Sequence, residues 1–88
     1  MSVIHKINLK LVDNQIKTLP LGFKILSCQI QHGDIALWYM WDGETNKKQK
    51  VHIVIVGTGN ECDLDGYTYI STFQQGVFVW HVFYKSCQ

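Results

Sequence analysis

The residues of this chain best suited to chemistry are four histidines and three cysteines. They are His5, His32, His52 and His81, and Cys28, Cys62 and Cys87. None of them has the close spacing of a zinc-binding pair, so the sequence predicts no metal site, and only the folded chain decides whether separate strands assemble one. We expect His5, His52 and His81 to be hydrogen-bonded structural residues within strands, and His32 to stand at a hairpin tip. His81, between Trp80 and Val82, is the best candidate for a buried ligand contact or a pH-sensitive group.

Catalysis is not indicated by the remaining polar residues. A nucleophilic triad needs a serine or cysteine, a base and an orienting acid, but no nucleophile elbow or Cys-His signature is present. The acidic segment 61–66 matches part of a calcium-binding loop, yet Thr72 stands where that loop needs glutamate, and no helices flank it. We therefore expect a protein that is not an enzyme and uses no cofactor.

The segment Gly57-Thr58-Gly59 follows an apolar run, as a dinucleotide-binding turn would. The third glycine of that motif is replaced by Cys62 and no helix is indicated, so a strand end bent by glycine is the plainer interpretation. Exposed backbone amides could still contact a ligand. Two aromatic-rich segments favour core packing, with a stacking surface for a nucleotide-like ring as the alternative. The predicted ligand-binding residues are Trp38, Gly57, Thr58, Gly59, Trp80 and His81.

The elements that must position these residues are strands, because apolar and polar residues alternate with period two and no helical period is present. The pattern predicts strands over 3–11, 15–19, 24–31, 34–41, 50–56, 67–73 and 77–84, the second being short and ended by Pro20. His32-Gly33 predicts a tight hairpin turn. No helix is expected beyond, at most, a single turn near 61–65. We predict one domain over 1–88, an all-β antiparallel sandwich or partly open barrel of six to seven strands.

Composition limits the class of partner. The 88 residues carry a formal net charge of +1 and no arginine, which argues against binding to nucleic acid or to an anionic membrane. Three cysteines without a Cys-x-x-Cys pair indicate free thiols in a reducing cytoplasm. The N-terminus does not resemble a signal peptide, and the apolar runs are far shorter than the about 20 residues that span a bilayer.

Three of the predicted strands are apolar on both faces: 35–41, 51–56 apart from His52, and 77–84 apart from His81. A sheet packed on one side alternates apolar and polar residues, so these strands need cover on both sides. Since no helix is available to supply that cover, we expect a homo-oligomer, most simply a two-fold dimer.

Several segments of the chain resemble a family of short domains encoded by tailed bacteriophages. The matching segments are 19–26, 29–31, 37–38 and 57–59, and the most specific are Tyr-Ile-Ser-Thr at 69–72 and Val-Trp-His-Val-Phe at 79–83. The resemblance implies phage origin, a compact β fold and action in the cytoplasm of an infected bacterium. It carries no catalytic residue over to this chain.

These observations favour a small phage accessory protein that acts by non-catalytic binding. It would inhibit host defence by blocking a host bacterial protein or by sequestering a nucleotide-like small molecule. A virion-associated or assembly protein is the first alternative, and a small hydrolase or metal-dependent enzyme is the second.

Overall fold

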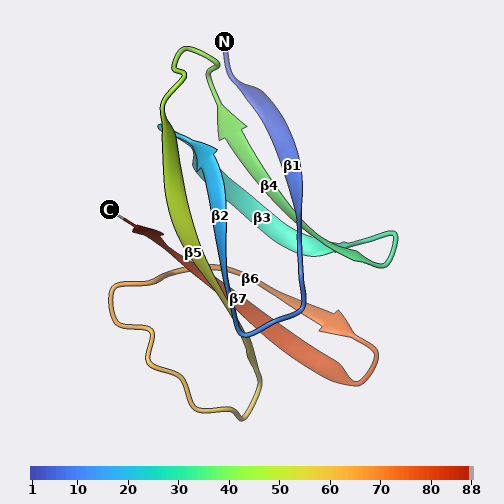
Figure 1. Cartoon of the computed structure of the whole chain (residues 1–88). Helices are drawn as coiled ribbons and strands as arrows, with labels where there is room; N and C mark the ends of the chain where they lie inside the picture. The colour runs from blue at the N-terminus through green and yellow to red at the C-terminus, as the bar shows by residue number, and fades with distance from the viewer. Residues whose placement is uncertain (88) are drawn as a thin grey trace.

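The computed structural model describes residues 1–87 and has seven β-strands and no helix within that range (Figure 1). The strands are β1 (Val3–Leu9), β2 (Asn14–Pro20), β3 (Lys24–Gln31), β4 (Asp34–Trp41), β5 (Lys48–Gly57), β6 (Thr68–Gln75) and β7 (Phe78–Cys87). The predicted all-β class is confirmed. The segment 61–65, the one place where the sequence left room for a single helical turn, is irregular. The last residue of the predicted 1–88 domain lies outside the described residues. No helix within residues 1–87 is long and apolar enough to span a bilayer.

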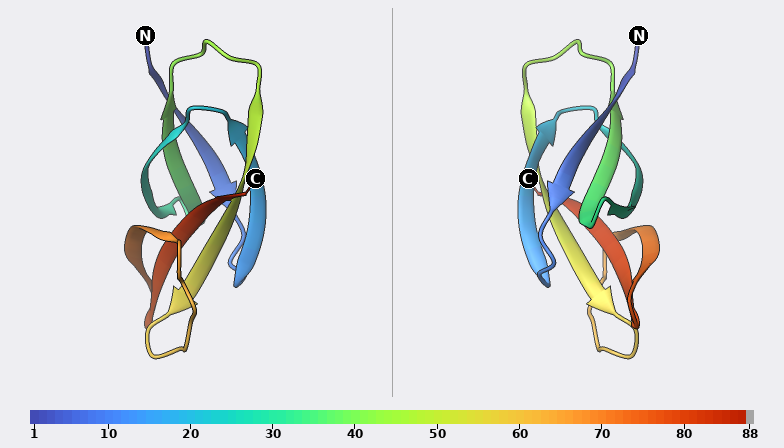
Figure 2. Two further views of the ribbon diagram at one scale, coloured as in Figure 1. Left: turned by 90° about the vertical axis from the view of Figure 1, so that its left-hand side faces the viewer. Right: turned by 90° about the vertical axis from the view of Figure 1, so that its right-hand side faces the viewer.

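The strands form two antiparallel sheets, as expected for a small sandwich. One has three strands in the order β1-β4-β3, and the other has four in the order β2-β5-β7-β6. The chain passes between the sheets three times, after β1, β2 and β4 (Figure 2). The sheets are not closed into a barrel by hydrogen-bonded strands within the described range, so each retains two edge strands.

The second strand is longer than its sequence pattern suggests. β2 has seven residues and pairs with β5 along its whole length, with Pro20 as its last residue. Pro20 is tolerated there because an edge strand does not need every backbone N–H for its ladder. β1 ends at Leu9, two residues earlier than predicted, because the chain turns toward the other sheet. The Gln15 side chain holds this turn by bonding both the N–H and the carbonyl of Lys10, at 3.1 and 2.7 Å.

The β3–β4 hairpin confirms the predicted turn at His32-Gly33. Both residues have positive φ, 51° at His32 and 83° at Gly33. Two consecutive positive φ values give a reversal whose twist matches that of the flanking strands. His32 is therefore a turn residue with no partner-binding role required to explain it.

The core lies between the two sheets. Its fully buried side chains are Leu19, Leu37, Ile53, Val51, Val82 and Cys28. The sheets are joined beside this core by Ser71, whose Oγ accepts a hydrogen bond from the backbone N–H of Cys28 at 2.9 Å. Both strands are irregular here, with register shifts between Ile25 and Ser27 and between Tyr69 and Ser71. These irregularities bring an edge amide of β3 within reach of a side chain of β6.

The connection from β5 to β6 crosses the four-stranded sheet. β5 and β6 both pair antiparallel with β7, so they run in the same direction and residues 58–67 must return along the sheet. We call residues 58–67 the crossover loop. Such connections usually contain a helix, but this one is irregular and covers part of the outer face of β5. The chain therefore covers part of the apolar outer surface of β5 itself.

Candidate functional site

The two mid-strand histidines of the four-stranded sheet, His52 and His81, lie on its outer face. Along β5, Val51, Ile53 and Ile55 point into the core, so His52, Val54 and Val56 point outward. Across the sheet, Val54 pairs with Phe83 and Val56 pairs with His81. Both mid-strand histidines of this sheet are therefore on one face, separated along β5 and β7 by an apolar pair.

His81 links three segments of the chain through both ring nitrogens. Nε2 lies 2.7 Å from Thr58 Oγ1, and Nδ1 lies 2.9 Å from Thr72 Oγ1. The Thr58 hydroxyl donates to the carbonyl of Val79 at 3.5 Å, so it accepts from Nε2–H. In the neutral ring Nδ1 then accepts from the Thr72 hydroxyl, which in turn accepts from Tyr69 Oη at 2.7 Å.

His52 holds the other end of the crossover loop. Its Nδ1 is hydrogen-bonded to the Tyr67 hydroxyl, and its Nε2 lies 2.9 Å from Asn14 Oδ1. Lys85, the cross-strand neighbour of His52, places its ammonium 5.7 Å from the centre of the Tyr67 ring. Thr58 begins the crossover loop and Tyr67 ends it. The two histidines therefore anchor both ends of the loop, which confirms the expectation that they are hydrogen-bonded residues.

The environment of His81 differs from the one expected from its aromatic neighbours in sequence. Trp80 and Val82 point to the opposite face of the strand, and His81 is half-buried among threonines. The prediction of a buried imidazole among aromatic rings is therefore wrong. Because both ring nitrogens are occupied, His81 acts in this structure as a positioning residue for Thr58.

A groove of about 470 Å³ lies where β5 ends and β7 begins. It is lined by Gly57, Thr58, Asn60, Val77, Phe78, Val79 and Trp80. The Trp80 ring stacks on Phe78 with centroids 5.7 Å apart. A Cβ at Gly57 would lie 3.1 Å from Trp80 Cζ3, so any other residue there would press the indole back by a few tenths of an ångström. We call this the aromatic groove.

The loop sequence Gly57-Thr58-Gly59 forms a tight turn, closed by a 3.1 Å hydrogen bond from the Asn60 N–H to the Gly57 carbonyl. Gly59 adopts φ 92°, a conformation that glycine accepts without strain. The two glycines thus have different roles, since Gly57 accommodates an aromatic ring and Gly59 permits the turn.

The fold brings together five of the six predicted ligand-binding residues, and three of these, Gly57, Thr58 and Trp80, line the aromatic groove. Gly57 pairs with Trp80, while Thr58 is bonded to His81 and precedes Gly59. Trp38 is separate, because it lies on the outer face of the three-stranded sheet, where it pairs with Lys6 and Ser27. Sequence reasoning missed Asn60, whose only signal is its position directly after Gly59. Phe78 also lines the groove; it belongs to one of the aromatic-rich segments but was not among the predicted ligand-binding residues.

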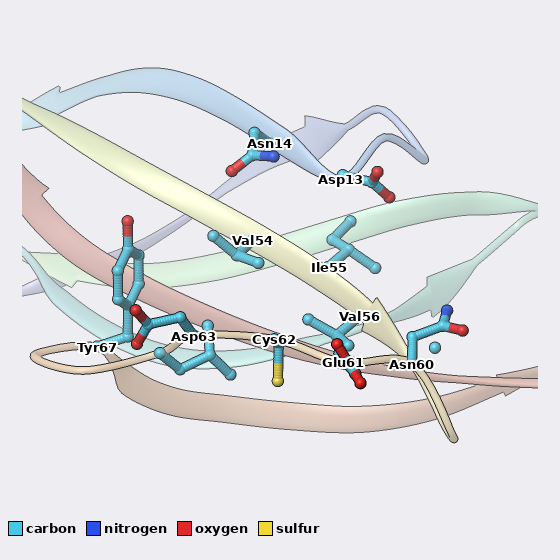
Figure 3. Close-up of a pocket in the computed structure, with 12 residues that line it drawn as sticks. Asp13, Asn14, Val54, Ile55, Val56, Asn60, Glu61, Cys62, Asp63 and Tyr67 are labelled. Carbon is cyan, nitrogen blue, oxygen red and sulfur yellow. The ribbon is translucent and has the colours of Figure 1, made fainter.

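A second groove, of about 400 Å³, runs between β5 and the crossover loop (Figure 3). Val54 and Val56 form its floor. Its rim carries three carboxylates, with Asp13 on one side and Glu61 and Asp63 on the other. We call it the acidic groove. Nothing in the sequence pattern placed Asp13 opposite the acidic segment, since they lie about 50 residues apart.

The cysteines are free thiols, as predicted: Cys28 is buried, Cys62 is exposed and Cys87 is half-buried. Burial raises the pKa of the Cys28 thiol from 9.0 to about 12, so it stays protonated near neutral pH. Among residues 1–87, no three histidines, cysteines or acids are grouped closely enough to hold a metal ion.

Comparison with known proteins gave one finding. Searches of curated proteins and of solved structures found no match. A family model described as "Domain of unknown function (DUF7352)" matches residues 1–88. The match spans the whole chain, so the protein belongs to the DUF7352 family.

Proposed function

We propose that this protein is a phage-encoded binding module that acts without catalysis and holds a small, nucleotide-like ligand in the aromatic groove. The observation that carries the proposal is the exposed aromatic stack. Phe78 is 59% exposed and is backed on one side by Trp80, which leaves Phe78 surface free for a planar ring. Base–aromatic stacking contributes about 1–3 kcal/mol per base.

The polar groups around this stack suit the base or ribose of a nucleotide better than its phosphate. The Thr58 hydroxyl is held by His81, and the Asn60 side-chain amide lies beside Gly57, so each offers hydrogen-bonding groups at the groove wall. None of the seven described lining residues is charged. We therefore expect selectivity for the base or nucleoside part, with phosphates extending into solvent.

The biological setting follows from the family resemblance seen in the sequence. A phage protein that removes a nucleotide-like signal from the cytoplasm of its bacterial host would counter a defence system that uses the signal. This setting is inferred by analogy with the resembling phage domains and is separate from the geometric argument for the groove.

Native mass spectrometry of protein purified from bacterial lysate, followed by thermal shift with nucleosides, cyclic nucleotides and ADP-ribose, tests this function. We expect a retained ligand mass, or a Tm increase of at least about 5 °C at saturating ligand. Phe78→Ala should abolish either signal. Ile4→Ala, which truncates a residue that is 60% exposed on the other sheet, is the matched control.

Failure of every nucleotide to bind, with no retained mass, would contradict the proposal. The same purification addresses a second candidate, the blocking of a host protein. Val77 and Phe78 are 88% and 59% exposed at the β6–β7 turn, and exposed apolar residues of this kind often anchor protein contacts. Capture of one bacterial protein that is lost with Val77→Ser would favour that candidate. Detection of the chain in purified particles would instead favour a virion role.

A further inference from the structure

The side chains on the outer face of β5 change from charged to apolar along the strand. Its outward residues begin with the exposed Lys48 and Lys50 and continue through His52 to Val54 and Val56. Beyond the lysines, the crossover loop lies over the same face and carries three exposed acids. From the beginning of β5 toward its end, this face is therefore first basic, then apolar and then acidic.

The centre of this face has exposed apolar side chains on both flanks. Ile16, on β2, is 53% exposed and pairs with His52. Tyr69, on β6, is 54% exposed and packs edge-on against Phe83, with ring centroids 5.5 Å apart. The crossover loop covers part of β5 but leaves these two residues open to solvent.

We propose that two copies of this chain associate through this face as a two-fold dimer, with their β5 strands running in opposite directions. A two-fold axis that lies in the interface plane, perpendicular to β5, brings the two faces together and reverses the strand direction, so the basic end of each copy meets the acidic groove of the other. The reverse alignment would place like charges together. The contact therefore forms twice, on either side of an apolar centre.

The acidic groove suits a lysine side chain as the occupant. Its apolar floor of Val54 and Val56 matches the aliphatic stem of lysine, and the rim carboxylates match the ammonium group. Lys48 and Lys50 of one copy would supply these side chains to the groove of the other. The described chain extends 41 × 30 Å in its two longer dimensions, which accommodates the roughly 800 Å² per partner of a stable interface.

The proposal is independent of a ligand in the aromatic groove, and the oligomeric mass tests it directly. Sedimentation velocity at low salt should give twice the 10.2 kDa subunit mass, with dissociation favoured as salt screens the charged contacts. The double variant Lys48→Glu/Lys50→Glu, and separately Glu61→Lys/Asp63→Lys, should each weaken the dimer at least about 10-fold. The quadruple variant that combines them should recover association, because both charge pairs are restored with opposite sign.

A separate variant tests the apolar centre of the proposed interface. Tyr69→Ser should yield a folded monomer by circular dichroism and mass, while Ile4→Ser on the three-stranded sheet should leave the dimer intact. A single-subunit mass at all salt and protein concentrations up to about 100 μM, which lies well above the dissociation constants of typical stable dimers, would overturn the proposal. So would a dimer that is unaffected by the charge reversals and by Tyr69→Ser, or one that is lost with Ile4→Ser.

Discussion

The two faces of the four-stranded sheet are built from alternate residues of the same strands, yet they are organised differently. On the inner face, Val51, Ile53 and Val82 have no solvent exposure and belong to the apolar core. On the outer face, His52 and His81 are interleaved with half-buried apolar residues and bonded to loop hydroxyls. The centre of the inner face is closed to water, whereas the outer face is only partly covered.

In so small a domain, the two faces separate the residues that stabilise the fold from those that are free to serve function. A core of this size provides a modest margin of stability, so it leaves little tolerance for polar residues between the sheets. The outer face has no such restriction. It can carry hydrogen-bonded histidines, a long irregular loop and exposed apolar residues that are suited to a partner. The following predictions test this division, starting with the largest expected effect.

The first prediction compares neighbouring residues of β5 on opposite faces. Ile53→Ala should lower the free energy of unfolding by about 2–5 kcal/mol, because it opens a cavity in a fully buried site. Val54→Ala, on the outer face, should cost less than about 1 kcal/mol. Urea unfolding monitored by tryptophan fluorescence measures both. Equal losses would contradict the distinction between the faces.

The second prediction concerns pH and the inner-face thiol. The pKa of Cys28 rises from 9.0 to about 12 on folding, so between these values the unfolded chain loses a proton that the folded chain keeps. The stabilising contribution is complete below pH 9 and falls by about 1.4 kcal/mol per pH unit above it. Urea unfolding across pH 8–11 should show this decline, and Cys28→Ala should flatten it.

Thiol labelling provides an independent check on the same residue. A maleimide reagent near neutral pH should modify the exposed Cys62 quickly and Cys28 only after denaturation. Rapid labelling of Cys28 in the native protein would show that the inner face is open to solvent.

The third prediction addresses the join between the two sheets. Ser71→Ala removes the acceptor for the Cys28 N–H and should cost about 1–3 kcal/mol, since a buried donor is left unpaired. Ser86→Ala, at a half-buried serine of β7, is the matched control and should cost less. A loss no larger than that of the control would mean that the Ser71 bond does not join the sheets energetically.

The smallest expected effect is on the outer face. Thr58→Val removes the hydroxyl that contacts His81 Nε2 and should cost about 0.5–1.5 kcal/mol. Hydrogen exchange should become faster at the Thr58 and Asn60 amides, which are bonded within this corner of the crossover loop. Thr18→Val, at an exposed position of β2, should leave exchange in the loop unchanged. Unaltered exchange in the Thr58 variant would show that His81 does not hold the loop.

Several features of the fold could be predicted from the sequence because they depend on local chemistry. Alternation at period two located all seven strands to within a few residues, and the His32-Gly33 turn followed from residues that tolerate positive φ. The exclusion of helix followed from the absence of a helical period. The Gly57–Gly59 segment could be singled out because glycine pairs mark strand ends.

The candidate site could be predicted only in part from the sequence, because its contacts join residues far apart in the chain. The sequence placed His81 beside Trp80, but strand pleating puts the two side chains on opposite faces, so His81 contacts threonines instead. Trp38 looked equivalent to Trp80 as an aromatic strand residue. The division of the strands between two sheets separates them, and no local pattern records that division.

Local sequence patterns were enough to predict the strand content, the free thiols and the two-sided apolar character of β4, β5 and β7. Which residues share a face, and which loop covers that face, became clear only from the folded chain. Alternation specifies the two sides of each strand, whereas strand order and register specify what lies beside them. Because β5 and β6 run parallel on either side of β7, the chain needs the crossover loop. That loop forms the acidic groove and carries the hydroxyls that bond to both histidines.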